Sequence, residues 1–137
     1  MAAVQVAEFE VMGKPVPQGS KTVFMVEGKP VLADANSKDL KPWRKTVAAT
    51  SKVEAAKRAI QRERAVAVHA TFTFERPKTV TREYPTVKPD LDKLIRAVFD
   101  AITESGLWAD DCQVVDMRIT KVYGPTAGVR VLVGEIK

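Results

Sequence analysis

Four aspartates fall in two pairs in the second half of the chain, Asp90 with Asp92 and Asp110 with Asp111. The first pair follows Pro89 and opens a helical pattern, and the second pair follows the end of that pattern. Clustered carboxylates repel one another unless a cation lies among them, and a divalent metal ion is the usual partner. In a chain whose net charge is +5, the two pairs predict a metal site for cutting nucleic acid.

Acids at the start of a helix also suit a second role, as capping residues. In a regular helix Asp90 and Asp92 project about 200° apart, so they can share a metal only if Asp90 precedes the helix. Either acid alone is more commonly a cap, and the second pair favours the metal. Because a helix of about fifteen residues rises roughly 22 Å, the spacing permits three carboxylates in one cleft without requiring it.

The rest of the composition narrows the chemistry. A single cysteine, Cys112, excludes an internal disulfide and a cysteine-rich zinc site, and a single histidine, His69, excludes nucleases that need several histidines. His69 lies on the polar side of a strand pattern and is expected at the surface. Carboxylate oxygens suit Mg²⁺ or Mn²⁺. Neither a membrane-spanning run nor a signal peptide is present, so a cytoplasmic location is expected.

Positive charge is concentrated in one segment, residues 38–64. It holds nine basic and three acidic side chains, a net charge of +6, so the remaining chain is about neutral. Interpreted as a helix, the segment places Trp43, Val47, Thr50, Val53 and Ile60 on one side and most of its cations on the other. The helix is either a solvated surface or a face that follows a phosphate backbone, and the acidic pairs favour the second.

Hydrophobic periodicity predicts an α+β fold in one domain, residues 1–137, with a mixed sheet and two main helices packed on it. Prolines at 77, 85 and 89 indicate a loop before the acidic motif, and Gly106 is typical of a helix end. The expected strands are 4–11, 22–26, 30–33, 65–74, 113–122 and 129–136, and the expected helices are 38–64 and 91–105. Asp110 and Asp111 are expected to open the strand at 113.

Three segments then resemble the signature of the RusA family of Holliday junction resolvases: Lys88–Leu94, Ala97–Ile102 and Gly106–Val115. Gly13–Lys21 is similar to that family's opening segment, and the chain length fits one family domain. The resemblance implies a magnesium-dependent endonuclease, acting as a homodimer on four-way DNA junctions in recombination, repair or the clearance of branched DNA. It also implies a frequent phage or prophage setting.

Carried over by position, the resemblance implies metal ligands at Asp90, Asp92 and Asp111, with Asp110 as a supporting acid. The family's functional lysine corresponds to Arg96, which keeps the charge but cannot donate a proton as lysine does. Whether one metal ion binds or two stays open. The cations expected to contact DNA are Lys21, Lys45, Lys52, Arg76, Lys88 and Lys93.

Two rival interpretations stay open. One is a nuclease of the restriction type, in which Asp90 would act with Glu135 and Lys137. The other is a DNA-binding protein without catalysis, in which the basic helix binds and the acids are caps.

Overall fold

The computed structural model describes residues 3–19, 21–34 and 37–137. Its elements follow the order expected from the sequence, a strand, a hairpin, a helix, a strand, a helix and two strands. Their bounds are β1 Ala3–Met12, β2 Lys21–Val26, β3 Lys29–Asp34, α1 Ser37–Lys57, β4 Val66–Phe74, α2 Leu91–Ser105, the 3₁₀ helix η1 Asp111–Gln113, β5 Val114–Tyr123 and β6 Gly128–Ile136.

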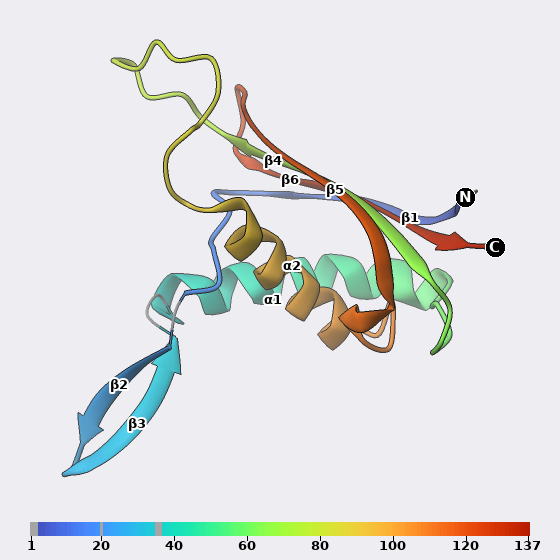
Figure 1. Ribbon diagram of the computed structural model, residues 1–137, viewed down its shortest axis with the longest axis horizontal. Coiled ribbons are helices and arrows are strands. Elements are labelled where there is room, and N and C mark those ends of the chain that lie inside the picture. The colour runs from blue at the N-terminus through green and yellow to red at the C-terminus, as the bar shows by residue number, and fades with distance from the viewer. Residues whose placement is uncertain (1–2, 20, 35–36) are drawn as a thin grey trace.

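A four-stranded mixed sheet in the order β1-β6-β4-β5 forms the centre of the molecule. β4 pairs in parallel with β5 and antiparallel with β6, and α2 makes the crossover between the two parallel strands. Both helices lie on the same side of this sheet (Figure 1). The expected α+β fold, a mixed sheet with two helices packed on it, is therefore confirmed.

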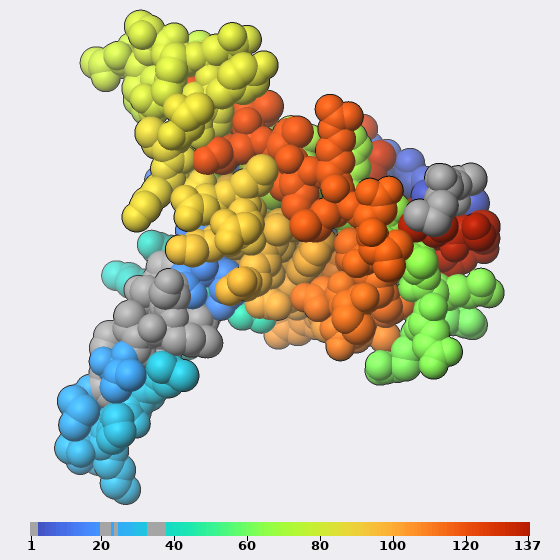
Figure 2. All heavy atoms as spheres, viewed as in Figure 1, coloured from blue at the N-terminus to red at the C-terminus, as the bar shows by residue number. Residues whose placement is uncertain are grey.

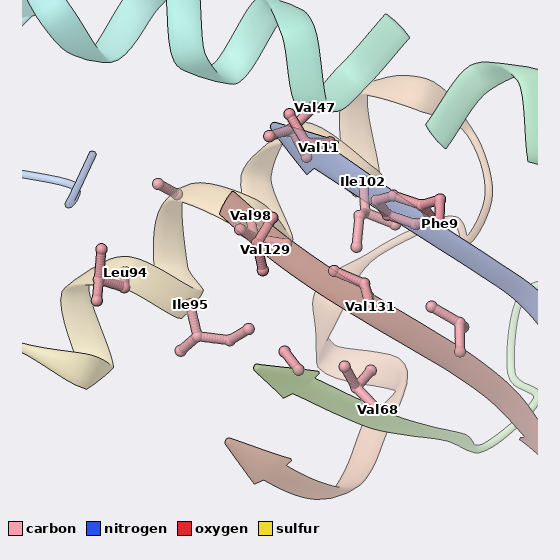
Figure 3. Packing of buried hydrophobic residues seen from close by; sticks show 14 of the residues in the cluster. Phe9, Val11, Val47, Val68, Leu94, Ile95, Val98, Ile102, Val129 and Val131 are labelled. Carbon is pink, nitrogen blue, oxygen red and sulfur yellow. The ribbon is translucent and has the colours of Figure 1, made fainter. Parts of the chain in front are cut away.

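The core lies between the helices and one face of the sheet. Alternate residues of β4 are buried, and the register brings Phe9 opposite Val131 and Val68 opposite Val133 on that face. α2 covers these strands with an apolar stripe, and Figure 3 shows Val98 and Ile102 of this stripe close to the strands. The apolar stripe of the helix and the alternate buried residues of the strands therefore pack together in one core layer.

α2 ends as its sequence predicts, and the chain then turns back under the sheet. Gly106 adopts the left-handed conformation, with φ 81°, which a residue without Cβ reaches at little cost. Trp108 is fully buried, donates its indole N–H to Thr103 Oγ1 at 2.7 Å, and packs edge-on against Phe99. This buried return brings Asp110 and Asp111 back alongside α2.

The first helix is shorter than expected, because α1 ends at Lys57 instead of Arg64. Ile60 leaves the helical path, donates its backbone N–H to the Leu107 carbonyl at 2.8 Å, and is buried against the core. Val53, expected on the apolar side, is 60 % exposed. Tertiary packing around Leu107 thus ends a helix that the charge pattern alone would continue.

Two segments project from this body in Figures 1 and 2, the hairpin β2–β3 and the loop of residues 75–90. The hairpin forms its own two-stranded sheet. Its strands expose Val23, Met25 and Leu32, each more than 60 % accessible. Within the described ranges, no helix has the length and apolar character needed to cross a membrane.

Candidate active site

A groove of about 520 Å³ between α2 and β5 collects three of the residues singled out from the sequence. Asp92 and Arg96 reach it from successive turns of α2, and Asp111 reaches it from η1. We call this the α2–β5 groove; its lining is Leu91, Asp92, Ile95, Arg96, Phe99, Asp111, Met117 and Ile119. Asp92 and Arg96 are exposed in this groove, whereas Asp111 is partly buried.

The surroundings of Asp111 disfavour its charged form. Its pKa is raised, first by partial burial, then by a hydrogen bond shared with the Asp110 side chain, and then by the negative charges of Asp110 and Asp100. Asp100 lies on α2, eight residues after Asp92, and is half-buried. Sequence reasoning missed it, although this spacing places the two acids on nearby faces of one helix.

Asp110 has a structural task, because it caps η1. Its Oδ1 accepts a hydrogen bond from the Cys112 backbone N–H at 3.2 Å, which lowers the Asp110 pKa. Gln113 completes the capping box, as its Oε1 accepts the N–H groups of Ala109 and Asp110. The expectation that these acids open a strand is wrong: β5 begins only at Val114, because the capped turn comes first.

The Gln113 side chain also explains how η1 is held in place. Its Nε2 donates to the carbonyls of Gln61 at 2.9 Å and Arg64 at 3.1 Å, both in the segment that follows α1. This buried amide thus ties the turn that carries Asp111 to a distant part of the chain.

Asp90 precedes α2, as a shared metal site requires. It is the N-cap residue with extended backbone, and its carbonyl accepts the Leu94 N–H, but its side chain makes no capping hydrogen bond. Its carboxylate lies 4.0 Å from the Lys93 ammonium. The capping interpretation therefore does not account for the Asp90 side chain.

Lys121 of β5 positions the segment that leads to Asp90. Its ammonium donates to the carbonyls of Val87 at 2.8 Å and Pro89 at 2.9 Å. A charged donor shared between two carbonyls is stronger than a neutral hydrogen bond. Lys121 therefore fastens the end of the loop to the edge strand, a role that no local sequence pattern signals.

The three acids implied as ligands do not converge. Asp90 faces two neighbouring grooves, whereas Asp92 and Asp111 share the α2–β5 groove. Among the residues that the structure describes, no three carboxylate, imidazole or thiol groups lie close enough to hold one ion. The charge of Asp100 acts on Asp111, and Asp100 lies eight residues after Asp92 on α2. At 1.5 Å per residue, Asp92 and Asp100 are about 12 Å apart along the helix.

The donor chemistry nevertheless fits a small hard cation. Mg²⁺ is commonly held by one or two carboxylates, with waters and substrate phosphate oxygens completing its shell. Asp92 and Asp111 supply two carboxylates in one groove, and the pKa of Asp111 is raised first by partial burial and then by its acidic neighbours Asp110 and Asp100. A cation there would offset this repulsion, so the residues present fit a site that phosphate helps to complete.

The cations expected to contact DNA occupy several places. Lys45 and Lys52 are exposed on α1, and Lys88 and Lys93 line a groove beside Asp90. Arg76 is engaged within the protein, with its guanidinium 5.0 Å from the Tyr123 ring and a hydrogen bond to the Glu83 carbonyl. Lys21 begins β2, and its side chain lies outside the described part of the structure.

The restriction-type rival fails on distance. Glu135 pairs with Val66 at one end of β4, whereas Lys121, beside the Asp90 segment, pairs with Phe72. Six strand residues separate these positions, about 20 Å at 3.3 Å each. Glu135 is instead held by Lys137 at 2.7 Å and Arg58 at 3.5 Å.

The sequence of this chain is similar to those of known proteins. The model of the family described as Endodeoxyribonuclease RusA matches residues 12–134. The chain is 29 % identical to the "Uncharacterized protein YqaN" of Bacillus subtilis (strain 168), over 94 % of this chain and 96 % of that protein.

Two nucleases resemble the chain over a shorter stretch. The crossover junction endodeoxyribonucleases RusA of Escherichia coli (strain K12) and of Enterobacteria phage 82 are each 58 % identical over 33 residues, 24 % of this chain and 28 % of theirs. Because the family model covers most of the sequence, the chain belongs to the RusA endodeoxyribonuclease family.

Proposed function

We propose that this protein is a Mg²⁺-dependent endonuclease that resolves four-way DNA junctions by paired symmetric nicks. It would act in recombination, repair or the clearance of branched DNA, in a phage or prophage setting. The observation that carries the proposal is the α2–β5 groove, which Asp92 and Asp111 both line in a member of this family.

Asp92 and Asp111 would hold the metal ion, and Asp90 would join them when DNA occupies the neighbouring groove. A bound Mg²⁺ supplies a water of lowered pKa and offsets negative charge on the phosphodiester. Asp110 keeps Asp111 in place by capping η1. Arg96 lies in the same groove as a fixed cation that can attract a phosphate oxygen, but it is not a proton donor at neutral pH.

A homodimer suits this function, because a four-way junction contains two symmetric strands to cut and one chain offers one set of acids. The hairpin β2–β3 supports a self-association surface. Val23 lies opposite Leu32 across the hairpin, so both belong to one face, and both are 64 % exposed. A two-stranded hairpin is marginally stable by itself, and covering this face would stabilise it.

The alternative is a DNA-binding protein without catalysis, whose acids are helix caps. Asp110 does cap η1, but Asp90 makes no side-chain capping bond at the start of α2. The nuclease is therefore the better supported function.

The deciding experiment compares a synthetic four-way junction with linear duplex of the same sequence, each with Mg²⁺ and with chelator. We expect symmetric nicks in the junction only when Mg²⁺ is present, and little cutting of the duplex. Junction binding without metal-dependent cutting would support the non-catalytic alternative instead.

A further inference from the structure

A second, larger groove lies on the other side of Asp90, and Lys88 and Lys93, two of the cations expected to contact DNA, line it. It has a volume of about 1010 Å³ and is bounded by the loop after β1, the first turns of α1 and the segment that enters α2. We call it the Trp43 groove; the lining residues that matter here are Lys14, Pro15, Pro17, Trp43, Lys88 and Lys93.

The groove combines apolar walls with positive charge. Its walls include Pro15, Pro17 and Trp43, while Lys14 and Lys88 are exposed at its edge. Flat apolar side chains together with nearby lysines suit a molecule with a flat ring and a phosphate. The basic side chains outnumber the acidic ones in the lining, three to two, which favours an anion.

Trp43 adds a polar feature to this apolar wall. Its side chain is 6 % exposed, and its indole N–H is buried without a hydrogen-bond acceptor among the described residues. A buried donor without a partner is energetically costly. The other tryptophan, Trp108, has its N–H satisfied by Thr103. A ligand that brings an acceptor atom to Trp43 would relieve this cost.

The position of the Trp43 groove beside Asp90 indicates which molecule would supply the ligand. Asp90 lines the Trp43 groove, and Lys93, which also lines it, is 4.0 Å from the Asp90 carboxylate. A DNA strand with its scissile phosphate at the acids therefore passes the mouth of this groove within a nucleotide or two. We propose that the Trp43 groove binds one nucleotide of the substrate, next to the cut, with its base out of the stack. The proposal rests on the proposed nuclease function.

This binding mode gives a physical reason for preferring branched DNA. Unstacking a base from a regular duplex costs a few kcal/mol, and the cost is least where pairing is already disturbed. A base at a branch point can enter the groove at low cost, whereas a base in linear duplex cannot. The groove would then select DNA structure before the acids act.

The first test uses NMR of the ¹⁵N-labelled wild-type protein without divalent metal. Its two indole N–H signals are assigned with Trp43→Phe. Each of the four deoxynucleoside 5′-monophosphates is then added, and deoxyribose 5-phosphate and inorganic phosphate serve as probes without a base. We expect at least one nucleotide to shift the Trp43 signal saturably at millimolar concentration, while the buried Trp108 signal stays in place.

The outcomes of this test are distinct. If no nucleotide moves the Trp43 signal, or if deoxyribose 5-phosphate moves it equally, the base-binding site is wrong. A Trp43 signal that responds only to dilution of the protein would show that a second copy of the chain covers the groove, which also overturns the proposal.

The second test fills the Trp43 groove with a larger side chain and leaves Trp43 itself unsubstituted. Thr46 lines the groove, and Thr46 and Thr50 make the same bond, each hydroxyl donating to the carbonyl four residues earlier at 3.0 Å. Thr46→Phe should lower the ratio of junction to duplex kcat/KM by about tenfold, the scale of one stacked base. Thr50→Phe, the matched control, should leave it within about twofold.

Both variants are first checked for an unchanged melting temperature, and an equal effect of the two would overturn the role of the groove. Failure here is separable from failure of the nuclease function, because nucleotide binding requires neither metal nor cleavage. If the junction is cleaved but no nucleotide shifts the Trp43 indole signal, only the proposed role of the groove is excluded. A nucleotide response without any cleavage excludes the nuclease function, and with it the position next to a cut, and leaves only a nucleotide-binding groove.

Discussion

Arg96 is the cation that the α2–β5 groove places with its two acids. It is one helical turn from Asp92 and one turn from Asp100, which interacts with Asp111. A guanidinium is a planar, permanently charged group, so Arg96 can offset the acids or bind a phosphate oxygen. At the residue scale, the proposed nuclease would therefore use this groove for charge stabilisation, and its proton acceptor would be a carboxylate or water.

We predict that Asp92→Asn and Asp111→Asn each lower kcat for junction cleavage by at least about 100-fold, since even outer-shell partners of a metal are worth 10–100-fold. Junction affinity, measured with chelator, should stay the same or rise because a repulsive charge near phosphate is removed. Asp116→Asn, an exposed acid on β5, is the control and should cleave normally. Near wild-type rates in both test variants would rule out the assigned ligands.

At the scale of elements, the position of Asp90, the N-cap residue of α2, depends on how the start of this helix is held in place. Its C-terminus is fastened by Gly106 and the buried Trp108, whereas its N-terminus follows a loop of about fifteen residues. Lys121 bridges that loop to β5 through the carbonyls of Val87 and Pro89. The position of Asp90 therefore depends on a residue of β5 that is distant from it in the sequence.

We predict that Lys121→Met lowers the free energy of unfolding by about 1.5–3 kcal/mol, the usual range for hydrogen bonds to a charged group. The Mg²⁺ concentration for half-maximal cleavage should rise several-fold, because Asp90 is no longer held, while chelator-measured junction affinity changes little. Lys121→Arg should restore part of the metal response. Lys78→Met removes the same charge from an exposed position in the loop that Lys121 bridges, and serves as control.

If Lys121→Met lowered stability but kept the wild-type Mg²⁺ response, Lys121 would be a structural residue only. A shift of equal size in Lys78→Met would mean that charge, and not the bridge to the loop, is responsible.

The exposed face of α1 is the second element with a testable role. We predict that the double variant Lys45→Glu, Lys52→Glu weakens junction binding and flattens the slope of log affinity against log salt by up to about 1.8, because each neutralised phosphate adds about 0.9 to that slope. The double variant Lys29→Glu, Lys78→Glu makes the same change in net charge at sites outside α1. Equal slopes for the two double variants would show that α1 is only a solvated surface.

At the scale of the whole molecule, the hairpin and the acids lie in different parts of the chain. The hairpin extends away from the sheet and helices, and its exposed apolar face has no described partner within the chain (Figure 1).

We predict that Val23→Lys with Leu32→Glu shifts the protein toward monomer in analytical ultracentrifugation, because the apolar face is replaced by charge. Val53→Lys alters a residue that is 60 % exposed on α1 and should leave the association state unchanged. A double variant that sediments like wild type would exclude the hairpin as the interface.

A mixed dimer tests the symmetric mechanism directly. A heterodimer of wild type with Asp111→Asn should nick one strand of a supercoiled cruciform and fail to make the second cut, since one subunit lacks a ligand. Wild-type homodimers should linearise the same plasmid in one binding event. Linearisation by the mixed dimer at the wild-type rate would mean that the two sites do not act independently, one on each strand.

The sequence by itself determined the elements whose patterns are local. The apolar stripe and terminal Gly106 predicted α2 with the bounds that the structure has, and alternation predicted β4 to within one residue. The acidic motifs and their spacing indicated the family, because a motif is a property of neighbours in the chain. The cap role of Asp110 was not predicted, because no pattern in the sequence signals the short 3₁₀ turn that comes before β5.

Only the tertiary structure decided where those residues meet. It ended α1 at Lys57 because Ile60 is drawn to Leu107, and it placed Asp111 in one groove with Asp92 and Arg96 while Asp90 faces another. It also revealed Asp100, Lys121 and the Trp43 groove, whose parts are distant in sequence. Local propensity carries no information on such encounters, since they depend on how the helices pack on the sheet.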